Sequence, residues 1–268
     1  MDRSDMTDAA VLLDAPESGI ARITLSNPTR LNAMRLSMWA RLGDICAQLA
    51  TDLPRVVVLR GDPGARGFCS GADISEFSKV RTTPDAIAAY NGTVARALDA
   101  LAHLPMPVIG AVHGACIGGG LELALRCDLR IATSDARFAF TPAKLGLAIG
   151  PDEVAALNRV VGPTATAELL YTAQPVDAAH AERWGLINRI TEPDTLDETV
   201  SEVGRIIAAN APLTLRAVKA SLRAAGRPGD ARAARHADDL VRTCYDSSDY
   251  VEGQRAFAEK RAPRFTGA

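Results

Sequence analysis

The chain has 268 residues, of which 47% are hydrophobic and 23% charged, proportions that suit one large globular domain and argue against extensive disorder. Its formal net charge of −2 provides no basic surface for nucleic acid or an anionic membrane. No apolar stretch approaches the roughly 20 residues that cross a bilayer, and the polar start does not have the pattern of a signal peptide. We therefore expect a cytoplasmic protein without nucleic-acid or membrane partners.

The N-terminal residues predict a hairpin followed by a helix. Residues 11–13 and 20–25 are short β-rich runs, and the Pro-Glu-Ser-Gly sequence between them, at 16–19, favours a turn. Residues 37–49 carry apolar side chains at helical spacing, and Ser37 is a suitable N-cap.

Strands and helices then alternate. The β-branched run at residues 56–59 is typical of a strand buried on both faces. Residues 83–104 predict a long amphipathic helix, 107–112 a second buried strand, 118–126 a buried helix and 129–132 a third strand. This order predicts parallel βαβ units and an α/β fold.

From about residue 164 the helical pattern dominates. The expected helices are residues 164–170, 178–184, 196–209, 213–225, 231–245 and 249–260, with a short extended piece at 187–190. We expect three parts: a flexible N-terminus at residues 1–10, an α/β core at 11–200 and a helical region at 201–268.

Two glycine-containing loops are the first candidates for a functional site. One, residues 67–74 (GFCSGADI), follows the strand predicted at 56–59, and the other, 114–122 (GACIGGGLE), leads from a strand into a helix. Glycine lets backbone N–H groups approach a ligand. Three glycines in a row weaken a helix start by roughly 1 kcal/mol each relative to alanine, which suggests that close backbone approach or tight packing requires them.

Together the loops suggest an oxyanion hole with one N–H donor from each, a device that stabilises transition-state charge by roughly 3–4 kcal/mol per donor. Two structural turns, the first with an aspartate helix cap, would produce the same local pattern, and so would a phosphate-binding nest. The Rossmann glycine spacing and the Gly-Lys-Ser/Thr of a P-loop are absent from both loops.

Among side chains, Glu122 is the main candidate for proton transfer. It lies on the first turn of the helix predicted at 118–126, where burial would tune its pKa, although the helix dipole alone also favours an acid there. No metal-ligand spacing and no C-x-x-C pair connects the five cysteines, Cys46, Cys69, Cys116, Cys127 and Cys244. We expect them to be reduced, small apolar side chains, and we expect no metal.

Several motifs occur in an order and spacing that resemble the crotonase superfamily, the enoyl-CoA hydratase/isomerase family. They are Asn27-Pro28, residues 31–34 (LNAM), the two glycine loops, Cys127-Asp128, Phe138, residues 144–146 (KLG), 178–187 and the tail 252–261. The likeness covers nearly the whole chain, and the two glycine motifs together are highly specific. It implies a crotonase-like spiral of ββα units with a helical C-terminal trimerisation region, assembled as a homotrimer or a dimer of trimers.

The resemblance also implies a ligand and its contacts. The ligand would be an acyl-CoA thioester, with no separate cofactor because coenzyme A is part of the substrate. The oxyanion donors would be the N–H groups of Ala72 and Gly119, and Glu122 would match the first of two hydratase glutamates. The implied substrate-binding residues are Arg30, Gly71, Ala72, Asp73, Ile74, Ser75, Gly118, Gly119, Pro142 and Lys260.

The chain departs from the hydratase pattern at the second glutamate. Pro142 stands at that position, and proline has no side-chain proton to transfer. Gly150 stands where dienoyl isomerases carry an acid. Asp152 and Glu153 follow closely, and they are either carboxylates that turn into the pocket or exposed loop acids.

Three functions stay open at this stage. Hydration of a 2-enoyl-CoA is the default reaction, with isomerisation as an alternative. The Thr141-Pro142 pair resembles the methylmalonyl-CoA decarboxylase branch, whose reaction needs no base, but Ile149 and Ala72 replace that branch's tyrosine and histidine. The third function, from another class, is a non-catalytic CoA-ester binding protein, against which the intact oxyanion glycines argue.

Overall fold

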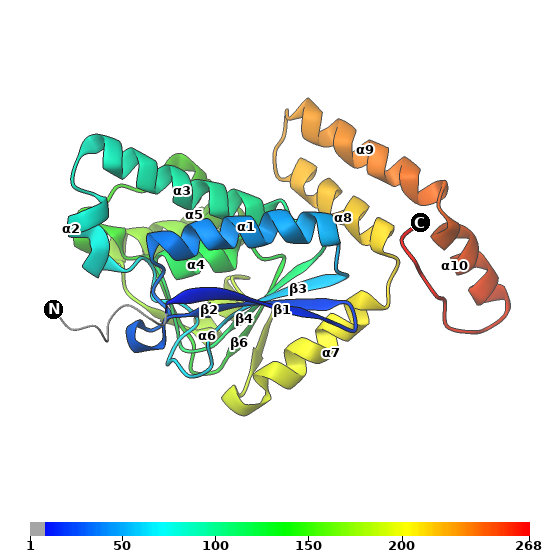
Figure 1. Ribbon diagram of the computed structural model, residues 1–268, viewed down its shortest axis with the longest axis horizontal. Coiled ribbons are helices and arrows are strands. Elements are labelled where there is room, and N and C mark those ends of the chain that lie inside the picture. The colour runs from blue at the N-terminus through cyan, green and yellow to red at the C-terminus, as the bar shows by residue number, and fades with distance from the viewer. Residues whose placement is uncertain (1–8) are drawn as a thin grey trace.

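A six-stranded sheet forms the centre of the computed structural model, which describes residues 9–268 (Figure 1). Its strands, in sheet order, are β1 (Ala10–Glu17), β2 (Ile20–Ser26), β3 (Val56–Gly61), β4 (Val108–Val112), β6 (Leu129–Thr133) and β9 (Arg189–Thr191). β1 and β2 form the predicted antiparallel hairpin, and the strands from β2 to β9 run parallel. The predicted parallel βαβ order is therefore confirmed. The N-terminus expected to be flexible lies almost wholly outside the described residues.

Helices cover both faces of this sheet. α1 (Leu36–Asp52), α3 (Pro84–Ala102) and α4 (Gly119–Leu125) lie on one face, and α7 (Leu196–Ala208) lies on the other (Figure 1). In β3, Val57 and Leu59 join the large core beneath α1 and α3, whereas Val56 and Val58 pack with Val200 of α7. This alternation confirms that the strand is buried on both faces, as its β-branched run predicts.

A second, small sheet holds the glycine loops together. It consists of β5 (Ala115–Ile117), β7 (Arg137–Ala139) and β8 (Val176–Asp177). Cys69 of the first glycine loop extends this sheet, because its N–H donates to the Ala115 carbonyl at 3.0 Å and its carbonyl accepts from the Ile117 N–H at 3.0 Å. Two loops separated by some forty residues thereby lie side by side.

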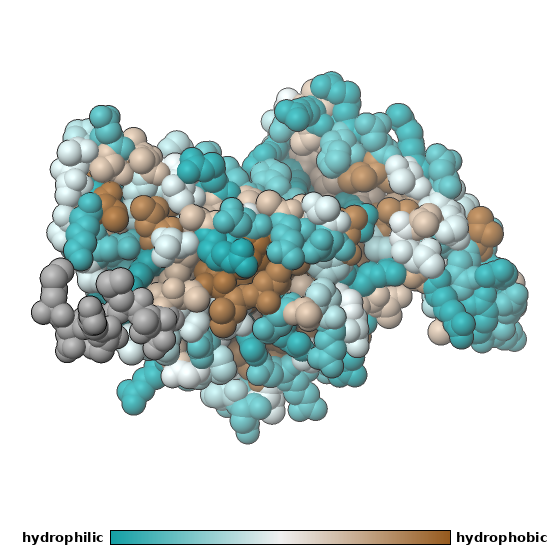
Figure 2. All heavy atoms as spheres, in the orientation of Figure 1, coloured by the Kyte–Doolittle hydropathy of each residue, from teal (hydrophilic) through white to brown (hydrophobic). Residues whose placement is uncertain are grey.

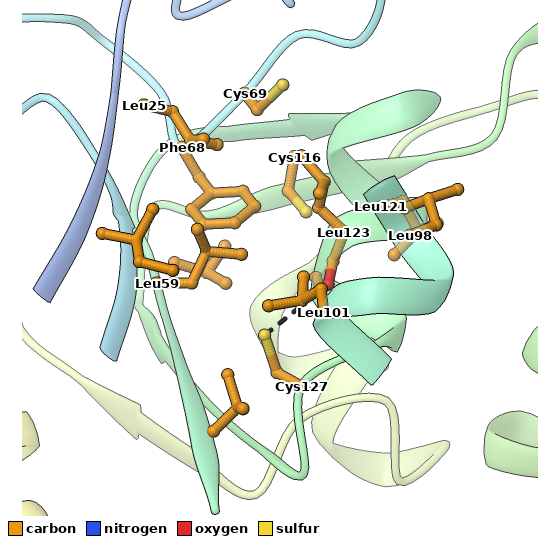
Figure 3. Packing of buried hydrophobic residues seen from close by; sticks show 14 of the residues in the cluster. Leu25, Leu59, Phe68, Cys69, Leu98, Leu101, Cys116, Leu121, Leu123 and Cys127 are labelled. Carbon is orange, nitrogen blue, oxygen red and sulfur yellow. Dashed lines mark hydrogen bonds between the residues drawn. The ribbon is translucent and has the colours of Figure 1, made fainter. Parts of the chain in front are cut away.

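The first loop is anchored in the core by Phe68. Figure 3 shows its ring among apolar side chains that include Leu101 of α3 and Leu123 of α4. All three side chains are fully buried. Burying an aromatic or aliphatic side chain of this size contributes about 1.5–3 kcal/mol, so the loop has a fixed position relative to α4.

The remaining helices make up most of the second half of the chain. They are α2 (Phe77–Val80), α5 (Pro151–Thr172), α6 (Ala178–Arg183), α8 (Pro212–Ala225), α9 (Ala231–Tyr245) and α10 (Ser248–Ala258), with short 3-10 turns at Pro28–Arg30, Ile74–Glu76, Pro142–Leu145 and Pro193–Thr195. Sequence periodicity predicts most of these helices to within two residues. None of the helices in residues 9–268 is long and apolar enough to cross a membrane.

Two helix starts differ from the prediction. α5 begins at Pro151 and consists of two helical segments that meet at Gly162, whose backbone is non-helical with φ +75°. The second segment contains the helix predicted at residues 164–170, whereas the first was not predicted. α1 begins at Leu36, so Ser37 lies inside the helix and is not its N-cap. The Leu36 N–H instead donates to the Glu76 carboxylate, 2.7 Å away, which satisfies a free helix N–H with a side chain distant in sequence.

The C-terminal helices leave the sheet after α8. In α8, the buried Lys219 lies 2.6 Å from the Asp128 carboxylate and donates to the Met106 carbonyl at 2.8 Å, which holds this helix against the core. α9 and α10 extend beyond it as an arm (Figure 1). The core boundary expected at residue 200 falls inside α7, where Val200 packs on the sheet.

Candidate functional site

A cavity of about 440 Å³ lies beside the two glycine loops. It opens beyond the carboxyl ends of the parallel strands, where α/β sheets commonly bind ligands. Its walls come from the loops, from α1, α3 and α4, and from the segment between β7 and the first turn of α5. The sequence-predicted site residues that line it are Gly71, Ala72, Ile74, Gly118, Gly119, Glu122, Pro142 and Glu153.

Asn32 of the LNAM motif is hydrogen-bonded to the backbone of the first glycine loop. Its side-chain amide donates to the Gly67 carbonyl at 2.8 Å and its side-chain oxygen accepts from the Asn27 N–H at 3.0 Å. Asn32 is fully buried, so this network has low access to water and holds the loop firmly. Asn32 thus holds the first glycine loop in place, and residues 31–34 do not themselves line the cavity.

The backbone of the first loop turns the N–H of Ala72 toward the cavity. The Gly71 carbonyl accepts from the Met34 N–H at 2.7 Å, and the Asp73 N–H donates to the Met34 carbonyl at 2.9 Å. Peptide groups alternate in direction along an extended strand. The Ala72 N–H between these two bonds consequently faces away from Met34.

The second loop presents the first N–H groups of α4. The Gly118 N–H donates to the Ala139 carbonyl at 2.9 Å, and the Gly118 carbonyl accepts from the Glu122 N–H at 3.0 Å. Gly118 has φ +52° and ψ −117°, a conformation that favours glycine. Gly119 is the first helical residue, so its N–H has no partner within the helix.

The two N–H groups are neighbours. A Cβ built on Gly71 would lie 3.3 Å from the Gly119 nitrogen, and one built on Gly119 would lie 3.6 Å from the Ala72 nitrogen. Within residues 9–268, neither the Ala72 N–H nor the Gly119 N–H donates a hydrogen bond to another group. The cavity therefore contains two adjacent, unpaired donors that suit a single oxygen acceptor.

Two carboxylates share the cavity with these donors. Glu122 is on the first turn of α4, and Glu153 is on the first turn of α5. Burial, and secondly the charge of Glu153, raise the pKa of Glu122 to about 7, while Arg126 opposes the shift. Asp152 is exposed and does not line the cavity.

The Glu153 carboxylate lies close to the backbone of Gly150. One of its oxygens is 2.5 Å from the point where a Cβ on Gly150 would stand. The absence of a side chain at residue 150 thus leaves the space that this carboxylate occupies. At Pro142, as the sequence predicts, the wall of the cavity has no proton-transferring group.

The rest of the wall was not predicted residue by residue. It includes Trp39 of α1, Phe77 of α2, Arg81, and Tyr90 of α3. Apolar periodicity places Trp39 on the buried face of its helix, but no local sequence signal brings these four residues to one cavity. Their meeting depends on how α1 and α3 pack.

The other predicted residues lie outside the cavity lining. Asp73 is buried, and although burial alone would raise its pKa, hydrogen bonds from Ser75 and Arg35 hold the pKa below its usual value. Arg30 is exposed, and its carbonyl accepts from the Ser70 hydroxyl at 3.0 Å. Lys260 is exposed, follows the end of α10 and does not line the cavity.

The cysteines supply no reactive group to the site. Burial raises the pKa of Cys46, Cys69 and Cys127 to about 12, so these thiols stay protonated and are poor nucleophiles. Among residues 9–268, no cluster of three or more His, Cys, Asp or Glu side chains is arranged to hold a metal ion.

Comparisons with known proteins agree with this geometry. The sequence pattern of the family described as Enoyl-CoA hydratase/isomerase matches residues 15–268. The chain is 31% identical to a short-chain-enoyl-CoA hydratase of Clostridium acetobutylicum, over 91% of this chain and 93% of that protein. It is 34% identical to an (E)-benzylidenesuccinyl-CoA hydratase of Thauera aromatica, over 93% and 96% of the two chains.

A solved structure has the same fold. An enoyl-CoA hydratase/carnithine racemase from Magnetospirillum magneticum superposes with a TM-score of 0.89 at 37% identity, covering 96% of each chain. This confirms the expected crotonase-like α/β fold. By its sequence, its fold and its two glycine loops, the chain belongs to the enoyl-CoA hydratase/isomerase family.

Proposed function

We propose that this protein hydrates a 2-enoyl-CoA thioester, with Ala72 and Gly119 polarising the carbonyl and Glu122 and Glu153 moving the protons. One observation carries the proposal: two unpaired N–H groups and two carboxylates line the same cavity. The relatives described as hydratases act on CoA esters by name, which supports this substrate class.

The N–H groups of Ala72 and Gly119 stabilise the enolate. When a nucleophile adds at C3 of the thioester, negative charge develops on the carbonyl oxygen. Two preorganised donors oriented to that oxygen lower the barrier by roughly 3–4 kcal/mol each. Because both donors belong to the backbone, their direction is set by the loops and requires no reorganisation during the reaction.

The carboxylate pair supplies the proton transfers. Water adds across C2=C3: its oxygen bonds to C3, one of its protons passes to a carboxylate, and a carboxylic acid delivers a proton to C2. The raised pKa of Glu122, about 7, lets this group donate or accept a proton near neutral pH. Glu153 provides the second group, which takes over the task that Pro142 cannot perform.

The reaction as proposed needs no group other than coenzyme A itself, which is part of the substrate. Isomerisation would use the same enolate and one carboxylate to move a proton between carbons. Decarboxylation would need no base, only one proton delivered to C2 of the enolate that remains after CO2 leaves, so it would not use both carboxylates. The presence of the pair therefore favours a reaction that transfers protons.

A panel of esters with three variants tests this function. Crotonyl-CoA, a dienoyl-CoA and methylmalonyl-CoA are offered to the wild type, Glu122→Gln, Glu153→Gln and the control Asp152→Asn. We expect crotonyl-CoA hydration that falls about 10²–10⁴-fold in each glutamate variant and stays close to the wild-type rate in the control.

Other outcomes would select other functions. Release of CO2 that survives both glutamate substitutions would identify a decarboxylase. Movement of a double bond without addition of water would identify an isomerase. Tight binding of every ester with no turnover would identify a non-catalytic CoA-ester binding protein.

We also propose that α8 and the arm formed by α9 and α10 bind a second copy of the chain, in a homotrimer or dimer of trimers. An apolar groove of about 870 Å³ lies between these helices, and brown spheres in Figure 2 lie between α8 and α9. Leu222 is 69% exposed and Phe257 is 88% exposed, and both line this groove. A large contiguous apolar surface of this kind is uncommon on monomeric proteins. In such an assembly, Lys260 on the arm would serve a neighbouring copy's coenzyme A.

A further inference from the structure

Three polar groups belong to side chains that line the cavity. They are the guanidinium of Arg81, the hydroxyl of Tyr90 and the indole N–H of Trp39. All three are hydrogen-bond donors, and the catalytic scheme above uses none of them.

Arg81 is held by aromatic rings and by no carboxylate. Its guanidinium carbon lies 4.8 Å from the centre of the Phe77 ring and 5.0 Å from the centre of the Tyr90 ring. These rings meet edge to face, with their centres 5.8 Å apart. Within residues 9–268 Arg81 forms no salt bridge. Stacking fixes the direction of its planar group and leaves its N–H donors free.

Tyr90 and Trp39 are more deeply buried. Tyr90 is 3% exposed and Trp39 is 1% exposed. Within residues 9–268 neither polar atom forms a well-aligned hydrogen bond, but the Trp39 side chain lies close enough to the Tyr90 hydroxyl to lower the Tyr90 pKa. Burial raises the pKa of Tyr90 to about 12, so its hydroxyl stays a donor. A buried, unpaired donor typically costs about 1–3 kcal/mol, and a ligand oxygen would relieve this cost.

The chain's own acids do not serve these donors. Glu76 and Asp73 are the acids that act on Tyr90, but both are engaged elsewhere. Glu76 accepts from the Leu36 N–H at 2.7 Å, and Asp73 accepts from Arg35 at 3.1 Å. Among residues 9–268, neither of these two acids is therefore available as an acceptor for Arg81 or Tyr90.

The position of Trp39 relates these donors to the acyl group. A Cβ on Gly119 would lie 3.2 Å from a carbon of the Trp39 indole, so the indole packs beside one of the proposed carbonyl-binding N–H groups. The phosphates of coenzyme A are separated from the thioester by the long pantetheine arm. An acceptor near Trp39 is therefore part of the acyl group and not a coenzyme A phosphate.

We propose that the acyl chain of the substrate carries a carboxylate, which binds Arg81 and accepts a hydrogen bond from Tyr90. The substrate class is then a CoA monoester of a dicarboxylic acid. This inference rests on the proposed function, because it takes the cavity to be the acyl site.

Two saturated esters of equal chain length test the inference by binding alone. Glutaryl-CoA ends in a carboxylate, valeryl-CoA ends in a methyl group, and neither has a double bond to hydrate. Titration calorimetry of the wild type is expected to show glutaryl-CoA binding about 10–100-fold more tightly, the range for hydrogen bonds to a charged group. Equal affinities would overturn the inference.

Variants of the cavity wall identify which side chains cause the preference for glutaryl-CoA. Arg81→Leu is expected to abolish the preference for glutaryl-CoA while leaving the affinity for valeryl-CoA within about twofold. Tyr90→Phe removes only the hydroxyl and is expected to reduce the preference by about fivefold. Lys79→Leu, an exposed cation on α2 outside the cavity lining, is the matched control and is expected to keep the preference.

The outcomes also separate this inference from the proposed function. If Arg81→Leu weakens both esters equally, Arg81 contacts the coenzyme A portion and the inference is wrong, while crotonyl-CoA turnover still supports the function. If the wild type binds neither ester, the acyl-CoA site itself is refuted, and the carboxylate site fails with it.

Discussion

At the scale of single residues, Glu122 makes the folded state less stable at high pH. Its pKa is about 7 in the folded chain against an ordinary value of 4.5, so the folded state binds the proton more strongly. Stability present below pH 4.5 is therefore lost as the pH rises through about 7. We expect Glu122→Gln to raise the free energy of unfolding at pH 8 by about 1–3 kcal/mol, and by less at pH 5.

Urea denaturation at the two pH values measures this difference. Asp152→Asn, which removes an exposed acid on the first turn of α5, controls for the loss of one negative charge. An equal gain in stability at pH 5 and pH 8 would contradict a raised Glu122 pKa.

Glu153 contributes to that pKa through its charge. Glu153→Gln removes the Coulombic repulsion but not the burial, so we expect the Glu122 pKa to fall toward its ordinary value while staying above it. Titration of a ¹³C-labelled Glu122 side chain by NMR measures the shift directly, without activity. If the pKa stays near 7 in Glu153→Gln but falls in Asp152→Asn, the assignment of the second carboxylate is wrong.

Sequence alone shows that residue 142 lacks a proton-transferring side chain. It does not show that Glu153 supplies the second carboxylate of the cavity. A proline at residue 142 excludes proton transfer whatever the fold. Placing Glu153 requires the first segment of α5, before Gly162, which helical periodicity does not predict. Its N-terminal signals, Pro151 followed by two acids, are those of a first helical turn. The Gly150 backbone then leaves room for the carboxylate, and only coordinates show this contact.

At the scale of elements, α4 depends on close contact with the first glycine loop. A Cβ on Gly120 would overlap the Cys69 carbonyl oxygen, and backbone atoms cannot move aside as a flexible side chain can. We expect Gly120→Ala to lower the free energy of unfolding by about 1–3 kcal/mol through overpacking, and to reduce turnover by displacing Gly119.

Gly92→Ala in α3 is the matched control. A Cβ there would meet only the far end of the Arg96 side chain, at 3.4 Å. In a helix interior alanine is favoured over glycine by about 1 kcal/mol, so thermal unfolding of this variant is expected to shift upward. A Gly120→Ala protein as stable and active as the wild type would refute the close-contact account.

Local sequence pattern predicts some boundaries of helices and strands and misses others. Periodicity locates α3, and in the structure the Thr83 hydroxyl caps this helix by accepting from the Ala86 N–H at 3.2 Å. It fails for the start of α1, because the capping group is Glu76, forty residues away. It also misses β5 and β7, which have three residues each and form only because the loops pair with them.

At the scale of the whole molecule, the proposed assembly depends on the apolar groove of the arm. Leu222→Asp would place a charge in a buried interface, which is strongly unfavourable without a partner. We expect this variant to be a monomer under conditions in which the wild type is a trimer or hexamer, as measured by light scattering after gel filtration.

Leu12→Asp is the control for that experiment. Leu12 is 49% exposed on β1, away from the arm, so this variant is expected to keep the wild-type mass. A wild type that is monomeric at high concentration would contradict the proposed assembly.

The overall architecture could be predicted because each strand, helix and glycine loop of the core has its own local sequence signal. Buried β-branched runs such as 56–59 and the glycine loops determine the parallel core and its ligand-binding edge. The acyl side of the cavity could not be predicted, because Trp39, Arg81 and Tyr90 meet only through the packing of α1 against α3. The cavity wall is a property of tertiary structure, and no single segment encodes it.

The central claim is that the N–H groups of Ala72 and Gly119 polarise a thioester carbonyl. Infrared difference spectra of butyryl-CoA with a ¹³C-labelled carbonyl, free and bound, test it without turnover. We predict a lower carbonyl stretching frequency in the bound ester than in water, with the shift retained in Glu122→Gln because the donors are backbone groups. An unchanged or higher frequency in the bound ester would contradict the account.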